Sequence, residues 1–273
     1  MTRGGKRVES YETIVTEEAD GVLTCRFNRP DRRNAVDDTM HKELVRFFSA
    51  VASDDAIRVV IVTGEGAAFC AGGDLAHMDE VFEHHDEGHS GLFRDAANLF
   101  RAILSIRQPI ISAINGDAIG LGASLAVMAD ISFMSTSARI GDPHVRAGLV
   151  PGDGGMIVWP LLMPLNMVKE LMFTGRLLGA EEAKQLGLVN RAVAPEDLQG
   201  DVLALARDIA TRPQHALHFT KRVLNKLVEE RATYSLDLGL AFEAVTLGTA
   251  DHKRAVEKFV TKAGQGTKPA LRI

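Results

Sequence analysis

The chain has 273 residues, of which 46% are hydrophobic and 25% charged, and its 31 basic and 36 acidic side chains give a formal net charge of -5. This composition is typical of a soluble globular protein, and the lack of a basic excess argues against nucleic acid as a partner. Two cysteines, Cys25 and Cys70, are too few for a disulfide framework and favour a reducing compartment. The first residues show no signal peptide, and the most apolar stretch, 110–133, is interrupted by glycines and polar residues. We therefore expect a cytoplasmic protein without a membrane partner.

Strand and helix patterns alternate in the N-terminal half of the chain. Two strands around a turn at Ala19-Asp20-Gly21 predict a hairpin, and Asp37 or Asp38 is placed to cap the helix that follows. Continuous apolar runs predict strands that are buried on both faces, so the alternation favours an α/β core with right-handed crossovers. In chain order we predict strands at 13–16 and 22–27, a helix over 40–51, a strand at 58–63, a helix at 92–106, a strand at 110–114, a helix at 123–128, a strand at 131–135 and a helix at 154–162.

Only helices are predicted beyond about Asp201. Their apolar positions follow the helical period, and Ala194-Pro195-Glu196-Asp197 looks like a helix start. We therefore expect two parts, a core at 1–198 and a helical region at 199–273 that packs on this core or on another subunit. The predicted helices are 202–210, 215–228, 236–247 and 254–262.

The 25 glycines are spread unevenly and cluster at 64–73, 116–122 and 148–155, each time beside a β-branched or apolar run. Glycines at a strand–loop–helix turn let the backbone approach a ligand, and free N–H groups at a helix start favour an anion. For any single loop, tight packing at an ordinary turn is the better explanation. Neither a phosphate-binding P-loop nor a strand-linked dinucleotide fingerprint is present.

Five segments, in the same order along the chain, resemble the enoyl-CoA hydratase/isomerase (crotonase) family. Each glycine loop is weakly specific alone, whereas the ordered set covers the chain from about residue 13 to the last helix. The segments are Asn28-Arg29-Pro30 with Asn34-Ala35; Phe69-Cys70-Ala71-Gly72-Gly73-Asp74-Leu75; Asn115-Gly116-Asp117-Ala118-Ile119-Gly120-Leu121-Gly122; Gly148-Leu149-Val150-Pro151-Gly152-Asp153-Gly154-Gly155; and Thr174-Gly175-Arg176 with Ala180-Glu181-Glu182-Ala183 and Gly187-Leu188-Val189-Asn190.

The resemblance implies a ββα superhelical core with a C-terminal helical domain that forms trimers, often as a dimer of trimers. It also implies an acyl-CoA thioester, with coenzyme A as part of the substrate and no separate cofactor. The backbone N–H groups of Gly73 and Leu121 would hold the thioester oxygen as the substrate becomes an enolate. By the same resemblance the coenzyme A moiety would lie near Asn34, Ala35, Ala71, Asp74 and Leu75, and Phe259 and Lys262 would approach it from the last helix.

The family's hydratases carry two glutamates at positions that fall here on Ser124 and His144. We expect His144 to act as the general base, oriented by Asp142 or Asp153. Glu243, on a C-terminal helix, is a further candidate for the site. Ser124 could form a nucleophile–base–orienter set with His144 and Asp153, although serine is also an ordinary helix-start residue. The histidine run between 77 and 89 lacks compact ligand spacing, so we expect no metal.

Three functional hypotheses follow. The first is an acyl-CoA hydratase or isomerase that uses the Gly73 and Leu121 N–H groups with His144 and Asp153. The second is a C–C bond hydrolase of the β-diketone type, because a histidine–aspartate pair at this spacing resembles that branch of the superfamily. The third is an acyl-CoA-binding protein that kept the fold and lost catalysis.

Overall fold

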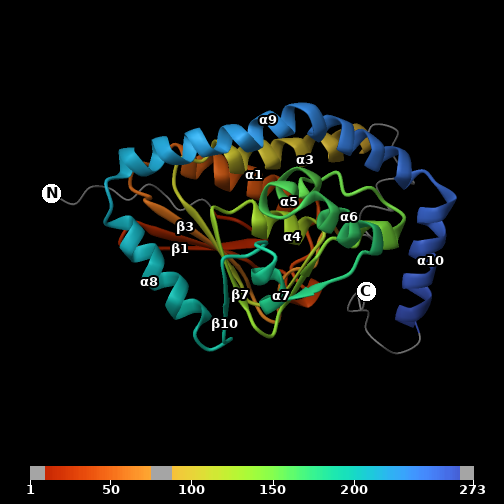
Figure 1. Cartoon of the computed structure of the whole chain (residues 1–273), viewed down its shortest axis with the longest axis horizontal. Helices are drawn as coiled ribbons and strands as arrows, with labels where there is room; N and C mark the ends of the chain where they lie inside the picture. Colours follow the sequence, from red (N-terminus) through yellow and green to blue (C-terminus); the bar gives the residue numbers. More distant parts are fainter. Residues whose placement is uncertain (1–9, 75–87, 265–273) are drawn as a thin grey trace.

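The computed structural model describes residues 10–74 and 88–264 and contains two sheets covered by helices (Figure 1). The larger sheet has the strand order β1-β2-β3-β5-β7-β10, and the smaller one the order β4-β6-β8-β9. Both are mixed, because β1 pairs antiparallel with β2 and β9 antiparallel with β8, whereas the other pairs are parallel. The strands are β1 (Ile14–Ala19), β2 (Val22–Phe27), β3 (Val59–Gly64), β4 (Ala68–Cys70), β5 (Ile110–Ile114), β6 (Asp117–Ile119), β7 (Ile131–Ser135), β8 (Arg139–Gly141), β9 (Leu178–Gly179) and β10 (Arg191–Val193).

Alternate residues of the central strands face two different apolar layers. On β3, Val60 and Val62 join the main core, whereas Val59 and Ile61 join a second cluster with Leu198 and other residues of α8. Successive side chains of a strand point to opposite faces, so a strand covered on both sides must be apolar throughout. This explains the unbroken apolar run that identified β3 in the sequence.

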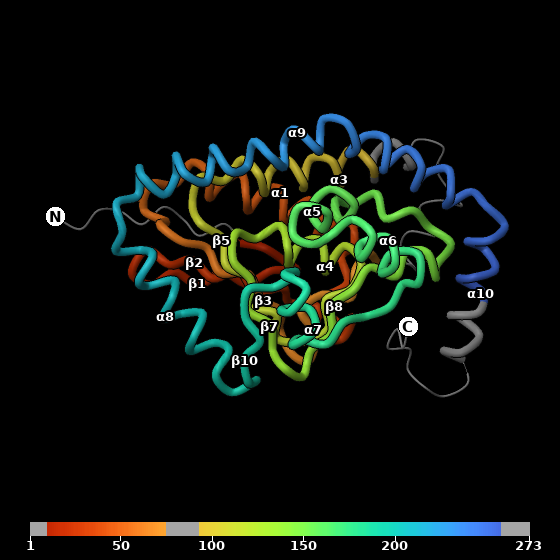
Figure 2. Tube along the Cα trace, viewed as in Figure 1, coloured from red at the N-terminus to blue at the C-terminus, as the bar shows by residue number. Residues whose placement is uncertain are grey.

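The helices lie outside the sheets, and Figure 2 traces their course in the same view. α1 begins as predicted, because the Asp37 carboxylate accepts a hydrogen bond from the Met40 N–H at 2.9 Å and thereby caps the helix. The helices are α1 (Asp38–Ala52), α3 (Gly88–Ser105), α4 (Leu121–Val127), α5 (Gly155–Leu162), α6 (Leu165–Thr174), α7 (Ala180–Gln185), α8 (Leu198–Ala210), α9 (Gln214–Leu247) and α10 (Ala250–Gly264), with short 3₁₀ turns η1 (Pro30–Arg32) and η2 (His144–Ala147).

The prediction of two helices at 215–228 and 236–247 is wrong, because α9 is one continuous helix of 34 residues. The polar segment between the two apolar stretches contains neither glycine nor proline, so nothing ends the helix there. α9 passes over α1 and α3 along the upper edge of Figure 1, and Lys221 anchors it to the core with Nζ 2.7 Å from Asp130 Oδ2. In the part of the chain that the structure describes, no helix is long and apolar enough to cross a membrane.

The sequence pattern did not predict the short strands of the smaller sheet, nor α6, α7 and β10. Strands of two or three residues carry no measurable periodicity. The hairpin is confirmed, and β5 and β7 begin and end at the predicted residues. The predicted α/β core and the all-helical C-terminal part are likewise observed, with α8 lying on the larger sheet and α9 on α3 and α5.

Candidate active site

Two backbone N–H groups meet where β4 and β6 end. A Cβ atom on Gly122 would lie 2.2 Å from the Cys70 carbonyl oxygen, so only glycine lets α4 start this close to β4. A Cβ on Gly72 would likewise lie 3.8 Å from the Leu121 nitrogen, which brings the Gly72–Gly73 segment beside the first residue of α4. Within residues 10–74 and 88–264, neither Gly73 N–H nor Leu121 N–H donates a hydrogen bond. Two unused donors therefore lie in neighbouring segments.

His144 lies next to this pair of donors and between two carboxylates. Its Nδ1 is 2.5 Å from Asp142 Oδ1, and its Nε2 is 3.6 Å from Asp153 Oδ2. Gly120 makes room for the ring, because a Cβ there would lie 3.2 Å from His144 Cε1. Asp142 and Asp153, which the sequence left as alternative partners, thus both flank the ring, each at a different nitrogen.

The electrostatics of this arrangement favour a charged imidazole. Burial by itself lowers the pKa of His144, but attraction to Asp142 and Asp153, the hydrogen bond that the ring donates to Asp142 and the more distant Glu243 outweigh it and raise the pKa to about 10. His144 is therefore protonated near neutral pH, and its ring carries two N–H donors.

Asp153 follows the loop that leads from η2 to α5. Burial raises its pKa and Asp142 adds to this effect, whereas His144, the Ser124 hydroxyl and the Gly155 N–H act in the opposite direction. The Ser124 Oγ donates to Asp153 Oδ1 at 2.8 Å. The hydroxyl therefore donates to the Asp153 carboxylate and not to His144. The alternative arrangement, in which His144 would accept the Ser124 proton and activate the hydroxyl as a nucleophile, is not present.

Glu243 reaches the same cluster from α9. A Cβ on Gly152 would lie 2.6 Å from Glu243 Oε2, so the loop that carries Asp153 passes directly over this carboxyl group. Burial raises the pKa of Glu243 to about 8; Asp153 and Asp142 add to the effect, and His144 and the Gly152 N–H oppose it. Glu243 is consequently a neutral acid near pH 7.

The segments expected to lie near coenzyme A form one folded unit beside β4. Val36 N–H donates to the Gly72 carbonyl at 2.8 Å, and Asp74 N–H donates to the Val36 carbonyl at 2.9 Å. Arg29 joins the same unit, since it bonds to the Ala35 carbonyl and its NH2 group lies 3.3 Å from Asp74 Oδ2. The only local sign of this role of Arg29 is its place in the Asn-Arg-Pro motif.

Asn34 and Ala71 belong to the unit in different ways. Asn34 is fully buried, accepts from Arg29 N–H at 2.9 Å and donates to the Glu65 and Ala68 carbonyls, so its side chain holds loops together. Ala71 contributes through its backbone, whose N–H donates to the Arg33 carbonyl at 3.0 Å.

All the expected ligand-binding positions stay predictions, and three of them fall on side chains that the structure does not describe. Leu75 lies outside the described residues, as does most of the histidine run. Phe259 and Lys262 belong to α10, whose side chains the structure describes only up to Glu257. Among the described residues, no group of three or more histidine, cysteine, aspartate or glutamate side chains is arranged to hold a metal ion.

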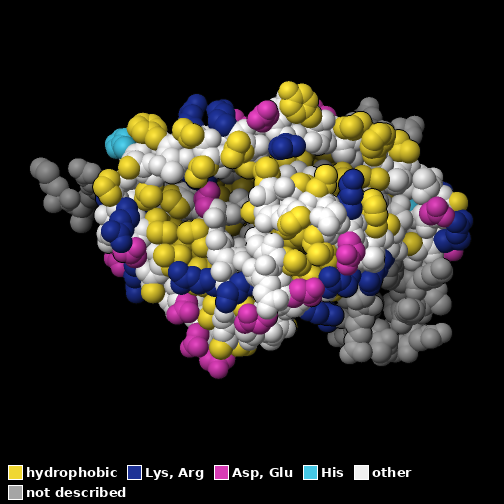
Figure 3. Space-filling view, in the orientation of Figure 1, with side chains coloured by type: hydrophobic (Ala, Val, Ile, Leu, Met, Phe, Trp, Pro, Cys, Tyr) yellow, Lys and Arg dark blue, Asp and Glu magenta, His cyan; other side chains and the backbone are white. Residues whose placement is uncertain are grey.

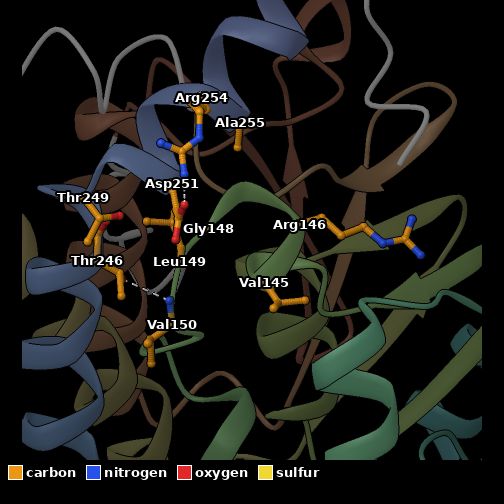
Figure 4. Close-up of a pocket in the computed structure, with 10 residues that line it drawn as sticks. All are labelled: Val145, Arg146, Gly148, Leu149, Val150, Thr246, Thr249, Asp251, Arg254 and Ala255. Atoms are coloured by element: carbon orange, nitrogen blue, oxygen red, sulfur yellow. Dashed lines mark hydrogen bonds and ion pairs between the residues drawn. The ribbon is translucent and has the colours of Figure 1, made fainter.

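A cavity of about 670 Å³ lies between η2 and the C-terminal helices (Figure 4). Its walls come from η2 and the residues after it on one side, and from the end of α9 and the start of α10 on the other. Two bonds hold these walls together: Val150 N–H donates to Thr246 Oγ1 at 3.2 Å, and His252 Nδ1 lies 2.7 Å from the Ala147 carbonyl oxygen. The C-terminal helices therefore contact the residues after η2 and hold them in place.

Comparison with known proteins identifies the family. A family model described as enoyl-CoA hydratase/isomerase matches residues 17–266. The chain is 32% identical to a crotonyl-CoA hydratase of Syntrophomonas wolfei over 93% of this chain and 96% of that one. It is 33% identical to a 1,2-epoxyphenylacetyl-CoA isomerase of Escherichia coli over 92% and 96% of the two chains. The crystal structure of an enoyl-CoA hydratase/isomerase from Mycobacterium paratuberculosis superposes with a TM-score of 0.87 at 34% identity, covering 92% of this chain and all of that one. With this fold and this likeness over nearly its whole length, the chain belongs to the enoyl-CoA hydratase/isomerase family.

Proposed function

We propose that this enzyme binds an acyl-CoA thioester and stabilises the enolate formed from it, with the N–H groups of Gly73 and Leu121 as the oxyanion hole. The observation that carries the proposal is the pair of N–H groups, of Gly73 and Leu121, that donate to no other described residue; Leu121 directly follows the glycine that borders His144. Donors that are fixed before the reaction stabilise a developing oxyanion by about 3 kcal/mol each. Hydration or isomerisation of an enoyl thioester is the reaction class that this scaffold supports best.

The proton transfers belong, in this proposal, to His144 and Asp153. Both lie in the buried cluster beside the proposed hole, and their facing atoms, Nε2 and Oδ2, are 3.6 Å apart. Ser124 supports Asp153 through its 2.8 Å hydrogen bond. Glu243 contributes a buried, neutral carboxyl group at the edge of the cluster.

We propose further that Ser124 and His144 occupy the two positions that hold glutamates in the family's hydratases. Their common neighbour is then Asp153, a carboxylate supplied from a different loop. A mechanism with two glutamates around one water would therefore be replaced by one centred on the His144–Asp153 pair.

Coenzyme A would lie against the unit formed by residues 29–37 and 71–74. The proposed contacts are with Asn34, Ala35, Ala71 and Asp74, with Leu75, Phe259 and Lys262 completing the site. Because the Asn34 side chain already makes three hydrogen bonds, its contribution is to hold the backbone of this unit. Arg29 lies between Asp37 and Asp74 and keeps the two loops together.

Oligomerisation would cover the outer face of α9. Apolar side chains line this helix along the upper edge of the molecule (Figure 3), and exposed apolar surface of this extent is typical of protein interfaces. We propose a homotrimer or a dimer of trimers formed through residues 199–273, and sedimentation equilibrium would test it; a monomer would contradict the proposal. The side chains on α9 that are more than half exposed are Phe219, Val223, Leu224, Leu227, Tyr234, Leu238, Phe242 and Val245.

The oxyanion hole is tested by removing one N–H group without changing the helix. Leu121 is the first residue of α4, a position where proline is tolerated, so Leu121→Pro deletes the donor, whereas Leu121→Ala shortens the side chain and keeps it. We expect Leu121→Pro to lower kcat for crotonyl-CoA hydration or for β,γ-enoyl-CoA isomerisation by about 100-fold or more, and Leu121→Ala to stay close to the parent enzyme. Equal activity of the two variants, at matched melting temperature, would contradict the assignment.

The histidine between two carboxylates supports a second candidate, a β-diketone C–C bond hydrolase that uses the same enolate chemistry. Cleavage of a cyclic β-diketone without turnover of any enoyl-CoA would replace the first proposal with this one. Tight binding of coenzyme A thioesters with no turnover in either assay would instead indicate a non-catalytic member of the family.

A further inference from the structure

We propose that Asp142 is a positioning residue that holds His144 doubly protonated, so that His144 donates protons and Asp153 accepts them. This inference rests on the proposed function and assigns the direction of proton transfer within it. The sequence alone favoured the opposite assignment, with His144 as the base.

The contact between Asp142 and His144 is built into the fold. Asp142 follows β8 directly and is 2% exposed, and its Oδ1 lies 2.5 Å from Nδ1 of the ring. Two glycines leave room for the pair: a Cβ on Gly155 would lie 2.7 Å from Asp142 Oδ2, and one on Gly120 would lie 3.2 Å from His144 Cε1. A carboxylate fixed at Nδ1 orients the ring and stabilises its charged form.

The second ring nitrogen then carries a proton that points toward the reacting region. Nε2 is 3.6 Å from Asp153 Oδ2, which is too long for a hydrogen bond. Within the described residues, Asp153 Oδ2 has no hydrogen-bond partner. Asp153 Oδ2 is therefore an unused acceptor beside Nε2, because Oδ1 already accepts from Ser124; the other unpartnered oxygen, Asp142 Oδ2, belongs to the carboxylate at Nδ1.

The protons balance in this assignment. Asp153 Oδ2 takes a proton from the substrate carbon beside the thioester, and the electron pair of the broken C–H bond becomes the enolate held by the N–H groups of Gly73 and Leu121. The enolate is then protonated at carbon, either by the proton now on Asp153 or by the Nε2–H of His144. In the second case Asp153 passes its proton to the neutral Nε2, and the enzyme returns to its starting state.

The charged groups around the ring agree with this direction. Asp142 follows β8 and Asp153 precedes α5, and both raise the pKa of His144 against the lowering effect of burial; Glu243, from α9, adds to this effect only where it is ionised, above about pH 8. The Ser124 hydroxyl, on α4, faces Asp153 and not the ring. Burial raises the pKa of Asp153, which makes it a stronger base than an exposed aspartate.

The test is an NMR titration of His144 in protein labelled with ¹⁵N-histidine. The chain has nine histidines, so His144 is assigned as the signal missing from His144→Gln. In the parent enzyme both ring nitrogens should be protonated at pH 7, with the Nδ1 proton shifted downfield by the short hydrogen bond. A neutral ring at pH 7 in the parent enzyme would overturn the inference.

Asp142→Asn removes the charge and keeps the size, and Asp117→Asn is the matched control because Asp117 pairs with Arg139 at 2.6 Å, away from the ring. We expect Asp142→Asn to lower the pKa of His144 by about one to three units and Asp117→Asn to leave it unchanged. If enoyl-CoA turnover is present, the alkaline limb of the kcat/KM profile should move down by the same amount in Asp142→Asn alone. An unchanged titration in Asp142→Asn would overturn the inference whether or not turnover is found, whereas absence of turnover with the expected titration would count against the proposed function only.

Discussion

Glu243 should destabilise the folded protein near neutral pH, because its pKa rises from 4.5 to about 8 on folding, chiefly through burial. Between these two values the folded state holds a proton that the unfolded state has lost, so stability falls as pH rises from about 4.5 and levels off above about 8. Each pKa unit corresponds to about 1.4 kcal/mol. At pH 7 this amounts to about 3 kcal/mol as an upper limit, which partial solvation will reduce.

Glu243→Gln removes the ionisable group and keeps the shape of the side chain, and its amide oxygen can still accept from the Gly152 N–H. We expect the variant to match the parent in free energy of unfolding at pH 4.5 and to be more stable by about 1–3 kcal/mol at pH 7. Urea denaturation at several pH values between 4.5 and 8.5, at one protein concentration, measures the difference. Glu182→Gln is the control, because Glu182 forms an exposed ion pair with Arg176 at 2.8 Å and should change stability by less than about 1 kcal/mol throughout. A difference for Glu243→Gln that is independent of pH, or that decreases as pH rises, would refute the reasoning.

Three further predictions concern buried groups elsewhere in the fold. Lys221→Met leaves the Gln108 carbonyl and the partly exposed Asp130 carboxylate without their ammonium donor and should lower the free energy of unfolding, measured in urea, by about 1–3 kcal/mol. Gly122→Ala places a Cβ 2.2 Å from a backbone oxygen, so it should cost about 3 kcal/mol or more in the same assay and abolish enoyl-CoA turnover. The thiols of Cys25 and Cys70 are both fully buried, and burial raises the pKa of each, that of Cys70 to about 12. Neither thiol should therefore react with a thiol reagent at pH 8 until urea unfolds the chain. Rapid reaction of the native protein would contradict the last prediction, and unchanged stability would contradict the first two.

Much of the fold could be predicted because its central elements are long and strongly patterned. β5 was found to the residue, since five buried apolar or small side chains stand between a proline and an Asn-Gly turn. α9 was divided wrongly because the inward face of its middle turns holds polar or small residues such as Glu229, Ala232 and Ser235, so no apolar period continues there. The helix continues there because its two apolar ends are fixed to the core, by Lys221 near the start and by Leu236 and Leu240 further on.

The residues of the candidate site could be predicted from the sequence, but not which carboxylate faces which nitrogen of the His144 ring. Ser124, His144 and Asp153 were brought together by motif positions, and the structure places all three in one cluster. The sequence could not assign one nitrogen of the ring to Asp142 and the other to Asp153, because that depends on how η2 turns after β8 and where the Gly152 loop crosses α9. The Asp-Pro-His order was the only local signal of the Asp142 contact.

The two halves of the site differ in what they require of the sequence. The N–H donors at Gly73 and Leu121 depend on close backbone contacts that only glycines at positions 72 and 122 permit, so side-chain substitutions around them leave the donors in place. The acid–base cluster depends on side chains from α4, the loop after β8, the loop before α5 and α9, each of which can be exchanged without moving the backbone. A chain that keeps the first half and alters the second retains the capacity to stabilise an enolate while it changes the proton chemistry performed on it. Under the proposed mechanism, with His144 at a position where the family's hydratases hold a glutamate, the imidazolium would place a positive charge beside the developing oxyanion and leave Asp153 to accept the proton.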